Sequence, residues 1–485
     1  MKRNTPLFNG ILRHIKQKKV GFHMPGHKGG LGLADDFKAY MPLLDVTETL
    51  GMDNLHFPQG EILKLQQKAA EVFGGDTSFI LVNGSTCGIH AMMLAACRPG
   101  DKIIISRDCH RSVLSAVVLA GLRPVYITPS FIEEYGITGC CTPDQVRQAL
   151  AMHPDARAVL VTYPNYYGLC GYLRDIADTV HLYGKLLLVD GAHGAHLGLS
   201  PNLPEDIASC GADMWVSSIH KTLNGLNQTA LLHVKGHRVD VDRLCTMVSM
   251  VQTTSPSYIL MSSIDLAVDK IAREGEGMMQ ILLEKVKLLR RGLEGIEGLK
   301  VLGREMAGRF GVCALDPTKV TVKTGDIMTG YQMEEQLWHK WGISVELSAP
   351  NHLMLLTTVF DDFDMYGYTV DAFRKVVGKY GSRPGDGAGC PAAVADFYTT
   401  LPAMGEGIMP PRQAVLGPTT AVPIHQSAGR VSAALVSVYP PGIPLLCPGE
   451  VVTRDGIEYI EYIKKTGGSI VGLRAEEELL VVNDR

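Results

Sequence analysis

The sequence predicts an α/β protein whose main part is a mostly parallel sheet with helices on both faces. Between about residues 60 and 235, short runs rich in Val, Ile and Leu alternate with stretches that carry apolar residues at helical spacing. The short runs are apolar throughout, which is typical of strands buried on both faces. A chain of 485 residues with 46% hydrophobic and 20% charged residues has a globular composition and is long enough for several domains.

The predicted elements follow one another in a regular order. Strands are predicted at residues 78–82, 101–106, 123–128, 156–164, 184–190 and 212–218, and helices at 62–74, 86–96, 111–122 and 142–153. The last helix has the clearest start signal, because Thr142 stands at the N-cap, Pro143 at the first helical position and Gln145 at the third. Alternation of this kind indicates parallel strands joined by helices.

Beyond residue 270 the pattern changes. A long amphipathic helix is predicted at 277–296, with strands at 319–324 and 352–359. The Gly- and Pro-rich segment 381–391 predicts a linker to a module with proline and β-type runs. We therefore expect an N-terminal arm at 1–40, a large domain at 41–270, a small α/β domain at 271–380 and a C-terminal α+β module at 391–485.

Charge and hydropathy argue against nucleic-acid and membrane partners. The formal net charge of −4 leaves no basic surface for nucleic acid. The longest apolar stretch, VLSAVVLAGL at 113–122, is too short to span a bilayer, and the N-terminus lacks the apolar run of a signal peptide. Eleven cysteines without regular spacing favour reduced thiols in a cytoplasmic protein over a disulfide framework.

Polar side chains follow several predicted strands, at the edge where such sheets bind ligands. After strand 78–82 come Gly84, Ser85 and Thr86, and then a helix. A glycine, two hydroxyls and the N–H groups of a helix start form a cradle for phosphate. By itself, such a turn more often only caps a helix.

Asp190 ends strand 184–190 and is followed by two histidines. A carboxylate at a buried strand end needs a partner, and a cationic ring nitrogen is one. His193 and His196 offer a competing interpretation, a metal pair. Gly194 between them disfavours the helical geometry of such pairs, and no third ligand stands nearby in the sequence, so we expect no metal.

The stretch SSIHKTLNG, at 217–225, places Lys221 at the end of strand 212–218. His110 follows strand 101–106 and is a candidate for stacking on a ring. A phosphate cradle, a stacking ring, an acid for a pyridinium nitrogen and a lysine for a Schiff base are the parts that pyridoxal 5'-phosphate requires. Each signal is weak alone, but four in strand order together predict this cofactor.

Seven motifs resemble those of the group III Orn/Lys/Arg decarboxylases. They are FHMPGHKGG (22–30), DVTETLGMDNLHFPQGEI (45–62), NGSTCGIHAM (83–92), DCHRSV (108–113), DGAHGAH (190–196), SSIHKTL (217–223) and GRVSAALVSVYPPGIPLLCPGE (429–450). The resemblance covers nearly the whole chain. It implies the aspartate-aminotransferase-like fold type I of pyridoxal-phosphate enzymes, with a seven-stranded sheet, and the short bacterial form without an N-terminal wing domain.

The resemblance also implies roles for individual residues. Lys221 would bind the cofactor covalently, Asp190 would pair with the ring nitrogen, and His110 would stack on the ring. Ala192 and His193 would lie near the ring, the phosphate would be held by Gly84, Ser85, Thr86, Ser218 and His220, and Glu450 would approach the distal cation of the substrate. The chain departs from the family pattern at Gly191, where Glu is commoner, and at Ala434, where an acidic residue is often found.

The expected function is therefore α-decarboxylation of a basic amino acid, arginine first and then lysine or ornithine, in polyamine or agmatine metabolism. The resemblance implies a homodimer or larger homo-oligomer with the active site at the subunit interface. Another fold type I reaction, such as transamination or elimination, is the alternative on the same cofactor. Two further classes are a non-catalytic regulatory protein that binds the cofactor and a metal-dependent hydrolase that uses His193 and His196.

Overall fold

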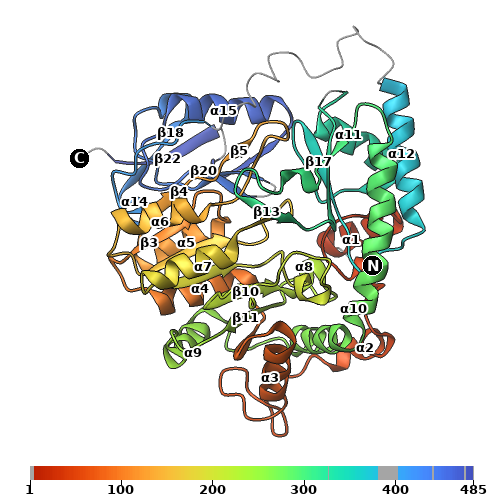
Figure 1. Cartoon of the computed structure of the whole chain (residues 1–485), viewed down its shortest axis with the longest axis horizontal. Helices are drawn as coiled ribbons and strands as arrows, with labels where there is room; N and C mark the ends of the chain where they lie inside the picture. The colour runs from red at the N-terminus through yellow and green to blue at the C-terminus, as the bar shows by residue number, and fades with distance from the viewer. Residues whose placement is uncertain (1–4, 326, 381–401, 440–441, 475–476, 484–485) are drawn as a thin grey trace.

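The computed structural model describes residues 5–325, 327–380, 402–439, 442–474 and 477–483. The predicted linker at 381–391 and the start of the expected C-terminal module lie outside these residues. Figure 1 shows three regions: a large sheet with its helices (orange to yellow), a smaller region beside the long helix α10 (green to cyan), and a C-terminal region (blue).

A seven-stranded sheet forms the centre of the large region. Its strands, in spatial order, are β2 (Thr77–Leu81), β11 (Ala230–Val234), β10 (Met214–Ser218), β9 (Leu186–Asp190), β7 (Ala158–Thr162), β3 (Lys102–Ser106) and β4 (Arg123–Ile127). Neighbours from β10 to β4 are parallel, while β11 runs antiparallel to both of its neighbours. The predicted mostly parallel sheet is confirmed. The sequence analysis did not predict strand β11, because His233 interrupts its apolar run.

Helices cover both faces because successive side chains of a buried strand point to opposite sides. Ile103 and Ile105 of β3 pack with α4 (Gly84–Ala96), α5 (Arg111–Ala120) and α9 (Val241–Val251). Ile104 packs on the other face with α6 (Pro143–Met152) and α7 (Leu173–Leu182). Helix α3 (Glu61–Phe73) covers that second face near β2. The predicted capping box of Thr142 and Gln145 is present at the start of α6.

Helix α10 (Tyr258–Glu294) joins the large and small regions. It begins well before the predicted start at residue 277, and it passes through the expected domain boundary at residue 270. Gly275 weakens the helical signal of the sequence there. A Cβ at Gly275 would lie 3.0 Å from Cδ2 of Leu199, so glycine permits the close approach of the helix to the segment at Leu199.

The small region contains a four-stranded antiparallel sheet. Its strands are β12 (Lys300–Val301), β14 (Lys319–Lys323), β17 (His352–Leu356) and β16 (Leu347–Ser348), and its helices include α11 (Gly330–Gln336) and α12 (Met365–Tyr380). Shorter strand pairs are β5 (Phe131–Ile132) with β6 (Ile137–Thr138), and β8 (Leu169–Gly171) with β13 (Val312–Leu315). The pair of β8 and β13 connects the large region to the small region, because β14 of the small sheet follows β13 directly in the chain.

The C-terminal region packs beside α5 and contacts Arg107, which follows β3. It contains the pair β18 (Thr419–Pro423) and β22 (Glu478–Val482), the sheet β20 (Ile443–Leu446), β19 (Val436–Tyr439) and β21 (Ser469–Val471), and the helices α14 (Pro411–Leu416) and α15 (Arg454–Lys465). Arg412 of α14 donates to the carbonyl of Leu119 in α5 at 3.0 Å, which fixes one contact between the two regions.

The N-terminal segment runs from the surface into the molecule. Helix α1 (Pro6–Lys16) buries none of its residues, and β1 (Val20–Gly21) pairs with β15 (Ile343–Ser344). Residues 22–30 then pass against α8 (Ile219–Thr222). The N–H of Gly26 donates to the carbonyl of His220 at 2.7 Å, and a Cβ at Gly26 would lie 2.2 Å from the carbonyl oxygen of Leu223.

Lys28 holds this segment in place from a buried position. Its amine donates to the carbonyls of Gly21, His23 and Leu356 at 2.8–3.1 Å, and it lies 3.3 Å from the Asp361 carboxylate. The FHMPGHKGG motif is therefore a packing element of the region around α8. Within the described ranges, every helix is too short or too polar to cross a lipid bilayer.

Candidate active site

The carboxyl ends of β10, β9, β3 and β7 open onto a cavity of about 450 Å³. Six of the sequence-predicted residues line it: Ser85, His110, Asp190, Ala192, His193 and Lys221. They come from turns and helix starts that follow different strands, and parallel strands bring those ends to one edge of the sheet. Most of the site residues that were predicted from strand ends therefore line one cavity.

Lys221 lies on α8, the short helix that follows β10 at Ser218. Its amine is 2.9 Å from Nε2 of His193. Burial lowers the pKa of Lys221, while the carboxylates of Asp190 and Glu346 oppose that shift. The site thus holds a lysine that can lose its proton more readily than a surface lysine.

Asp190 is the last residue of β9, and its side chain is buried. Its Oδ1 accepts a hydrogen bond from the N–H of Ala192 at 3.2 Å. The next residue, Gly191, has no room for a side chain, because a Cβ would lie 2.3 Å from Ile207 Cδ1 and 2.7 Å from the carbonyl oxygen of Val216. A residue with a side chain at position 191 would therefore require Ile207 and the backbone of β10 to shift.

His110 is the N-cap of α5. Its Nδ1 accepts from the N–H of Ser112 at 3.2 Å and lies 2.8 Å from Oγ of the same residue. Burial lowers the pKa of His110 to about 4, although the Asp190 carboxylate opposes the shift. The ring is therefore neutral near pH 7 and carries its proton on Nε2, because Nδ1 is the acceptor.

The expected phosphate cradle is partly assembled in this chain. Oγ of Ser218 donates to Oγ of Ser85 at 3.0 Å, beside the start of the 13-residue helix α4. Gly84 has φ of +76°, and the space around its missing Cβ is open. Thr86 is exposed and is not among the described residues that line the cavity. Two hydroxyls and helix N–H groups at one end of the cavity fit a phosphate group.

His220 lies on α8, beside Lys221 in the chain, and is not among the described residues that line the cavity. Its Nδ1 donates to the carbonyl of Thr229 at 2.8 Å, and burial lowers its pKa to about 4. Nε2 of the neutral ring is then an acceptor.

His193 and His196 do not face a common site. Nε2 of His193 meets Lys221, and its Nδ1 lies 3.1 Å from the amine of Lys319, whereas Nε2 of His196 lies 3.0 Å from Asp316. A lysine amine thus stands where a metal ion would bind on each nitrogen of His193. Within the described ranges, no three His, Cys, Asp or Glu side chains are placed to hold a metal ion.

Glu450, which we expected to approach the substrate, is not among the described residues that line the cavity. Its carboxylate lies 3.0 Å from Nη2 of Arg107 and accepts from the N–H of Cys447 at 2.9 Å. Arg107 also donates to the carbonyl of Pro444 at 2.8 Å. Glu450 thus connects the C-terminal region to the end of β3. Ala434 lies near Ser432 and is not a cavity residue either.

Glu346 is a carboxylate of the cavity wall that the sequence analysis missed. It stands between β15 and β16, and its two oxygens accept from the hydroxyl of Tyr166 at 2.6 Å and from the N–H of Met24 at 2.9 Å. All three residues line the cavity with Lys221. A glutamate in the run ISVEL was the available signal, but such alternation is equally typical of a half-exposed strand.

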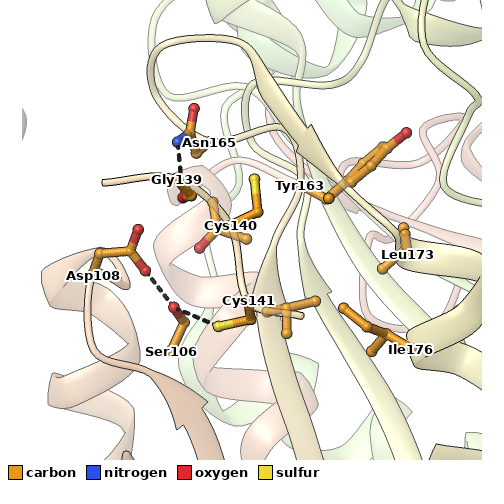
Figure 2. A pocket seen from close by; sticks show the side chains of 12 residues that line it. Ser106, Asp108, Gly139, Cys140, Cys141, Tyr163, Asn165, Leu173 and Ile176 are labelled. Carbon is orange, nitrogen blue, oxygen red and sulfur yellow. Dashed lines mark hydrogen bonds between the residues drawn. The ribbon is translucent and has the colours of Figure 1, made fainter. Parts of the chain in front are cut away.

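Asp108, another missed residue, separates the main cavity from a smaller one behind it. Figure 2 shows the carboxylate turned toward Ser106, which donates to it, with Asn165 above and Cys141 below. Oγ1 of Thr138 donates to Asp108 at 2.8 Å. Burial raises the pKa of Asp108 even though these hydroxyls oppose the shift. The small cavity, about 20 Å³, has room for one water molecule.

Comparisons with known proteins identify the family of the chain. The family model for "Orn/Lys/Arg decarboxylase, major domain" matches residues 5–364, and that for "Orn/Lys/Arg decarboxylase, C-terminal domain" matches residues 396–478. An arginine decarboxylase of Bacillus anthracis is 34% identical over 473 residues, covering 96% of this chain and 94% of the relative. An arginine decarboxylase of Bacillus subtilis is 34% identical over 461 residues, covering 94% and 93%.

The solved structure of lysine decarboxylase A from Pseudomonas aeruginosa has the same fold. Its TM-score is 0.77 at 22% identity, and the match covers 98% of this chain and 80% of that one. This likeness confirms the predicted fold class, an α/β fold of type I with a mostly parallel large sheet.

Proposed function

The chain belongs to the Orn/Lys/Arg decarboxylase family and is a decarboxylase, and we propose that it removes the α-carboxylate of a basic amino acid, with arginine as the favoured substrate. The observation that carries the proposal is one cavity that holds the Lys221 amine together with the carboxylates of Asp190 and Glu346. The two Bacillus relatives are named arginine decarboxylases, and the matches cover nearly the whole length of each relative. These names support arginine as the substrate.

The residues of the cavity fit pyridoxal 5'-phosphate as the cofactor. Ser85, Ser218 and the start of α4 would hold its phosphate, Asp190 its ring nitrogen, and Lys221 its aldehyde carbon. Bound there, the cofactor supplies a conjugated ring that accepts the electron pair left at the substrate Cα when CO2 departs. The Asp190 carboxylate keeps a proton on the ring nitrogen, because a buried anion stabilises a nearby cation.

Two side chains on the cavity can return a proton to the substrate Cα. The Lys221 amine is one, and Nε2 of His110, which carries the ring proton, is the other.

We propose that Glu346, and not Glu450, binds the distal cation of the substrate. The Glu346 carboxylate lies on the cavity wall and can accept further hydrogen bonds beyond those from Tyr166 and Met24. A guanidinium presents paired donors that match a carboxylate, and such charge-assisted bonds favour cationic over neutral side chains. The product from arginine would be agmatine.

We further propose that two copies of the chain form a dimer that covers the exposed apolar side chains near the N-terminus. Helix α1 exposes Leu7, Phe8 and Ile15 by more than half, and Leu50 and Phe57 are exposed in the segment before α3. Exposed apolar clusters of this kind are typical of subunit interfaces. Residues 22–30 continue from α1 to the cavity, so the interface would adjoin the active site.

A substrate panel tests the proposed function. Purified protein with pyridoxal 5'-phosphate is given arginine, lysine, ornithine or a neutral amino acid, and both CO2 and the organic product are measured. We expect CO2 and an amine from cationic substrates, fastest with arginine. A keto acid in place of an amine would indicate transamination, and no CO2 from any cationic substrate would overturn the proposal.

A further inference from the structure

The wall of the active-site cavity is built from separate parts of the chain. The large region supplies most of its residues, and Met24 and Glu346 join them from the N-terminal segment and the small region. The C-terminal region supplies Gly442 and Ile443. Ile443 is the first residue of β20, and Gly442 precedes it. The C-terminal region therefore forms part of the site itself.

Arg107 connects this C-terminal wall to the end of β3. Arg107 follows the last residue of β3, and its side chain is buried. The guanidinium donates to the carbonyls of Pro444 at 2.8 Å and Leu445 at 3.2 Å, and to the carboxylate of Glu450 at 3.0 Å. We call these three hydrogen bonds the Arg107 clamp. The clamp holds the backbone of β20 from the side of the large sheet.

Both ends of the Arg107 clamp lie next to residues of the cavity wall. Arg107 is followed by Asp108, and Pro444 is preceded by Ile443. Asp108 and Ile443 both line the cavity. The clamp therefore sets where the C-terminal wall stands relative to the end of β3.

The groups of the clamp are themselves held in place. The guanidinium of Arg107 lies over the ring of Tyr126, with 5.3 Å between Cζ and the ring centroid. The carboxylate of Glu450 also accepts from the N–H of Cys447 at 2.9 Å. The side chains of Arg107 and Glu450 are each only 5% exposed. Desolvation offsets much of the attraction within a buried ion pair, so such a pair is better suited to fix a register than to add stability.

The proposed cofactor leaves part of the cavity to the substrate. The residues that would hold the cofactor, such as Ser85, Asp190 and Lys221, all belong to the large region. The substrate side chain then faces the remaining wall, which includes Glu346 and Ile443. Glu346 offers a charge to the distal cation. Ile443 offers only apolar bulk, which discriminates between side chains by size.

We propose that Ile443 limits the length of the substrate side chain, and that Arg107 positions Ile443 through Pro444 and Glu450. Arg107 is a positioning residue, because it acts on the cavity wall and not on the substrate. The inference rests on the proposed function, since it needs a cationic amino acid in the cavity. It adds a limit on chain length to the charge selection that we assign to Glu346.

The test compares arginine with homoarginine, which has the same guanidinium and one more methylene. The ratio of kcat/KM for homoarginine to that for arginine is measured with the holoenzyme. Ile443→Ala shortens the wall residue to a methyl group, so this ratio should rise by about tenfold or more, the discrimination that an apolar pocket gives for one methylene. The ratio of arginine to citrulline should stay unchanged, because these two side chains differ in charge and hardly in length.

Ile470→Ala is the matched control. Ile443 and Ile470 both pair with Val438, one on each side of β19, and both are half-buried. Of the two, only Ile443 is among the described residues that line the cavity. Ile470→Ala should therefore leave the homoarginine-to-arginine ratio at its wild-type value.

Arg107→Lys tests the positioning role. Lysine keeps a positive charge for Glu450 but lacks the planar fork that reaches several acceptors at once. The homoarginine-to-arginine ratio should rise in the same direction as in Ile443→Ala, by a smaller factor. In the Ile443→Ala background, Arg107→Lys should change the ratio little further, because the side chain that it positions is gone. A merely structural role would lower the thermal stability and leave the ratio unchanged.

Two results would overturn the inference. One is an unchanged homoarginine-to-arginine ratio in Ile443→Ala, a reading that does not depend on how any Arg107 variant folds. The other is an effect of Arg107→Lys on the ratio that is equally large with and without Ile443→Ala. Decarboxylation of arginine with either result would reject the inference and keep the proposed function. A wild-type protein that releases no CO2 from any cationic amino acid would reject the function, and the inference with it.

Discussion

Glu346→Gln isolates the charge that we assign to substrate recognition. The amide can keep both hydrogen bonds of the carboxylate, because its oxygen can accept from the N–H of Met24 and its NH2 can donate to the hydroxyl oxygen of Tyr166. The variant should therefore fold and keep the shape of the cavity. What it loses is the negative charge that faces the distal cation of the substrate.

The size of the effect follows from the energy of one charge-assisted hydrogen bond. Such a bond contributes about 1.5–3 kcal/mol, and each 1.4 kcal/mol is tenfold, so kcat/KM for arginine should fall roughly 10- to 150-fold. Citrulline has nearly the same shape as arginine but a neutral end group. The ratio of kcat/KM for arginine to that for citrulline should therefore fall by the same factor, since the change acts on charge alone.

Glu450→Gln is the matched control, because both residues are partly or fully buried glutamates and only Glu346 lines the cavity. Loss of the Glu450 charge leaves the buried Arg107 guanidinium without its counter-ion, which should cost about 3 kcal/mol or more of unfolding free energy. The arginine-to-citrulline ratio should stay unchanged. The assignment of Glu346 fails if its variant keeps the wild-type ratio, or if Glu450→Gln changes the ratio and Glu346→Gln does not.

Three further predictions concern the cofactor site, the N-terminal segment and acid stability. Asp190→Asn should lower kcat by about 100- to 1,000-fold while the thermal unfolding of the apoprotein stays near wild type, because it removes a preorganised charge; near-normal turnover would contradict the role of Asp190. Gly26→Ala places a Cβ 2.2 Å from the carbonyl oxygen of Leu223 and should lower the unfolding free energy in urea by about 1–3 kcal/mol. Gly367→Ala, which has nothing within 4 Å of its Cβ, is the control and should not lower it. Equal unfolding free energies of the two variants would refute the packing argument. Burial opposes ionisation of Asp316, but His196 and Lys319 lower its pKa to about 2 from a reference value of 3.8, so its ionised form stabilises the fold above that reference value. That stability, about 2 kcal/mol, should be lost as pH falls toward 2, and Asp316→Asn should flatten this part of the pH–stability curve; an unchanged curve would contradict the assignment.

The site residues at strand ends could be predicted because the topology of a parallel sheet places those ends close together. Lys221, Asp190 and His110 each follow an apolar run, and the carboxyl ends of parallel strands lie at one edge of the sheet. The alternation of strands and helices and the capping box of α6 were also visible locally. Each of these predictions depends on short-range patterns alone.

The residues that the sequence analysis missed reach the site from far along the chain. Glu346 and Lys319 come from the small region, and a charged residue at the border of an apolar strand usually faces solvent. They are turned inward by tertiary contacts, of Lys319 with His193 and of Glu346 with Tyr166 and Met24. Glu450 was assigned to the substrate by family resemblance, but the structure pairs it with Arg107, and no sequence pattern specifies which buried arginine a glutamate will meet.

The attachment point of the cofactor tests the central claim most directly. Protein incubated with pyridoxal 5'-phosphate is reduced with borohydride, digested and examined by mass spectrometry for the modified lysine. We predict that the cofactor is bound to Lys221, and that Lys221→Ala leaves the buried Lys319 and the other lysines unmodified at the same cofactor concentration. Attachment to a different lysine, or none at all in a folded wild-type protein, would contradict the account.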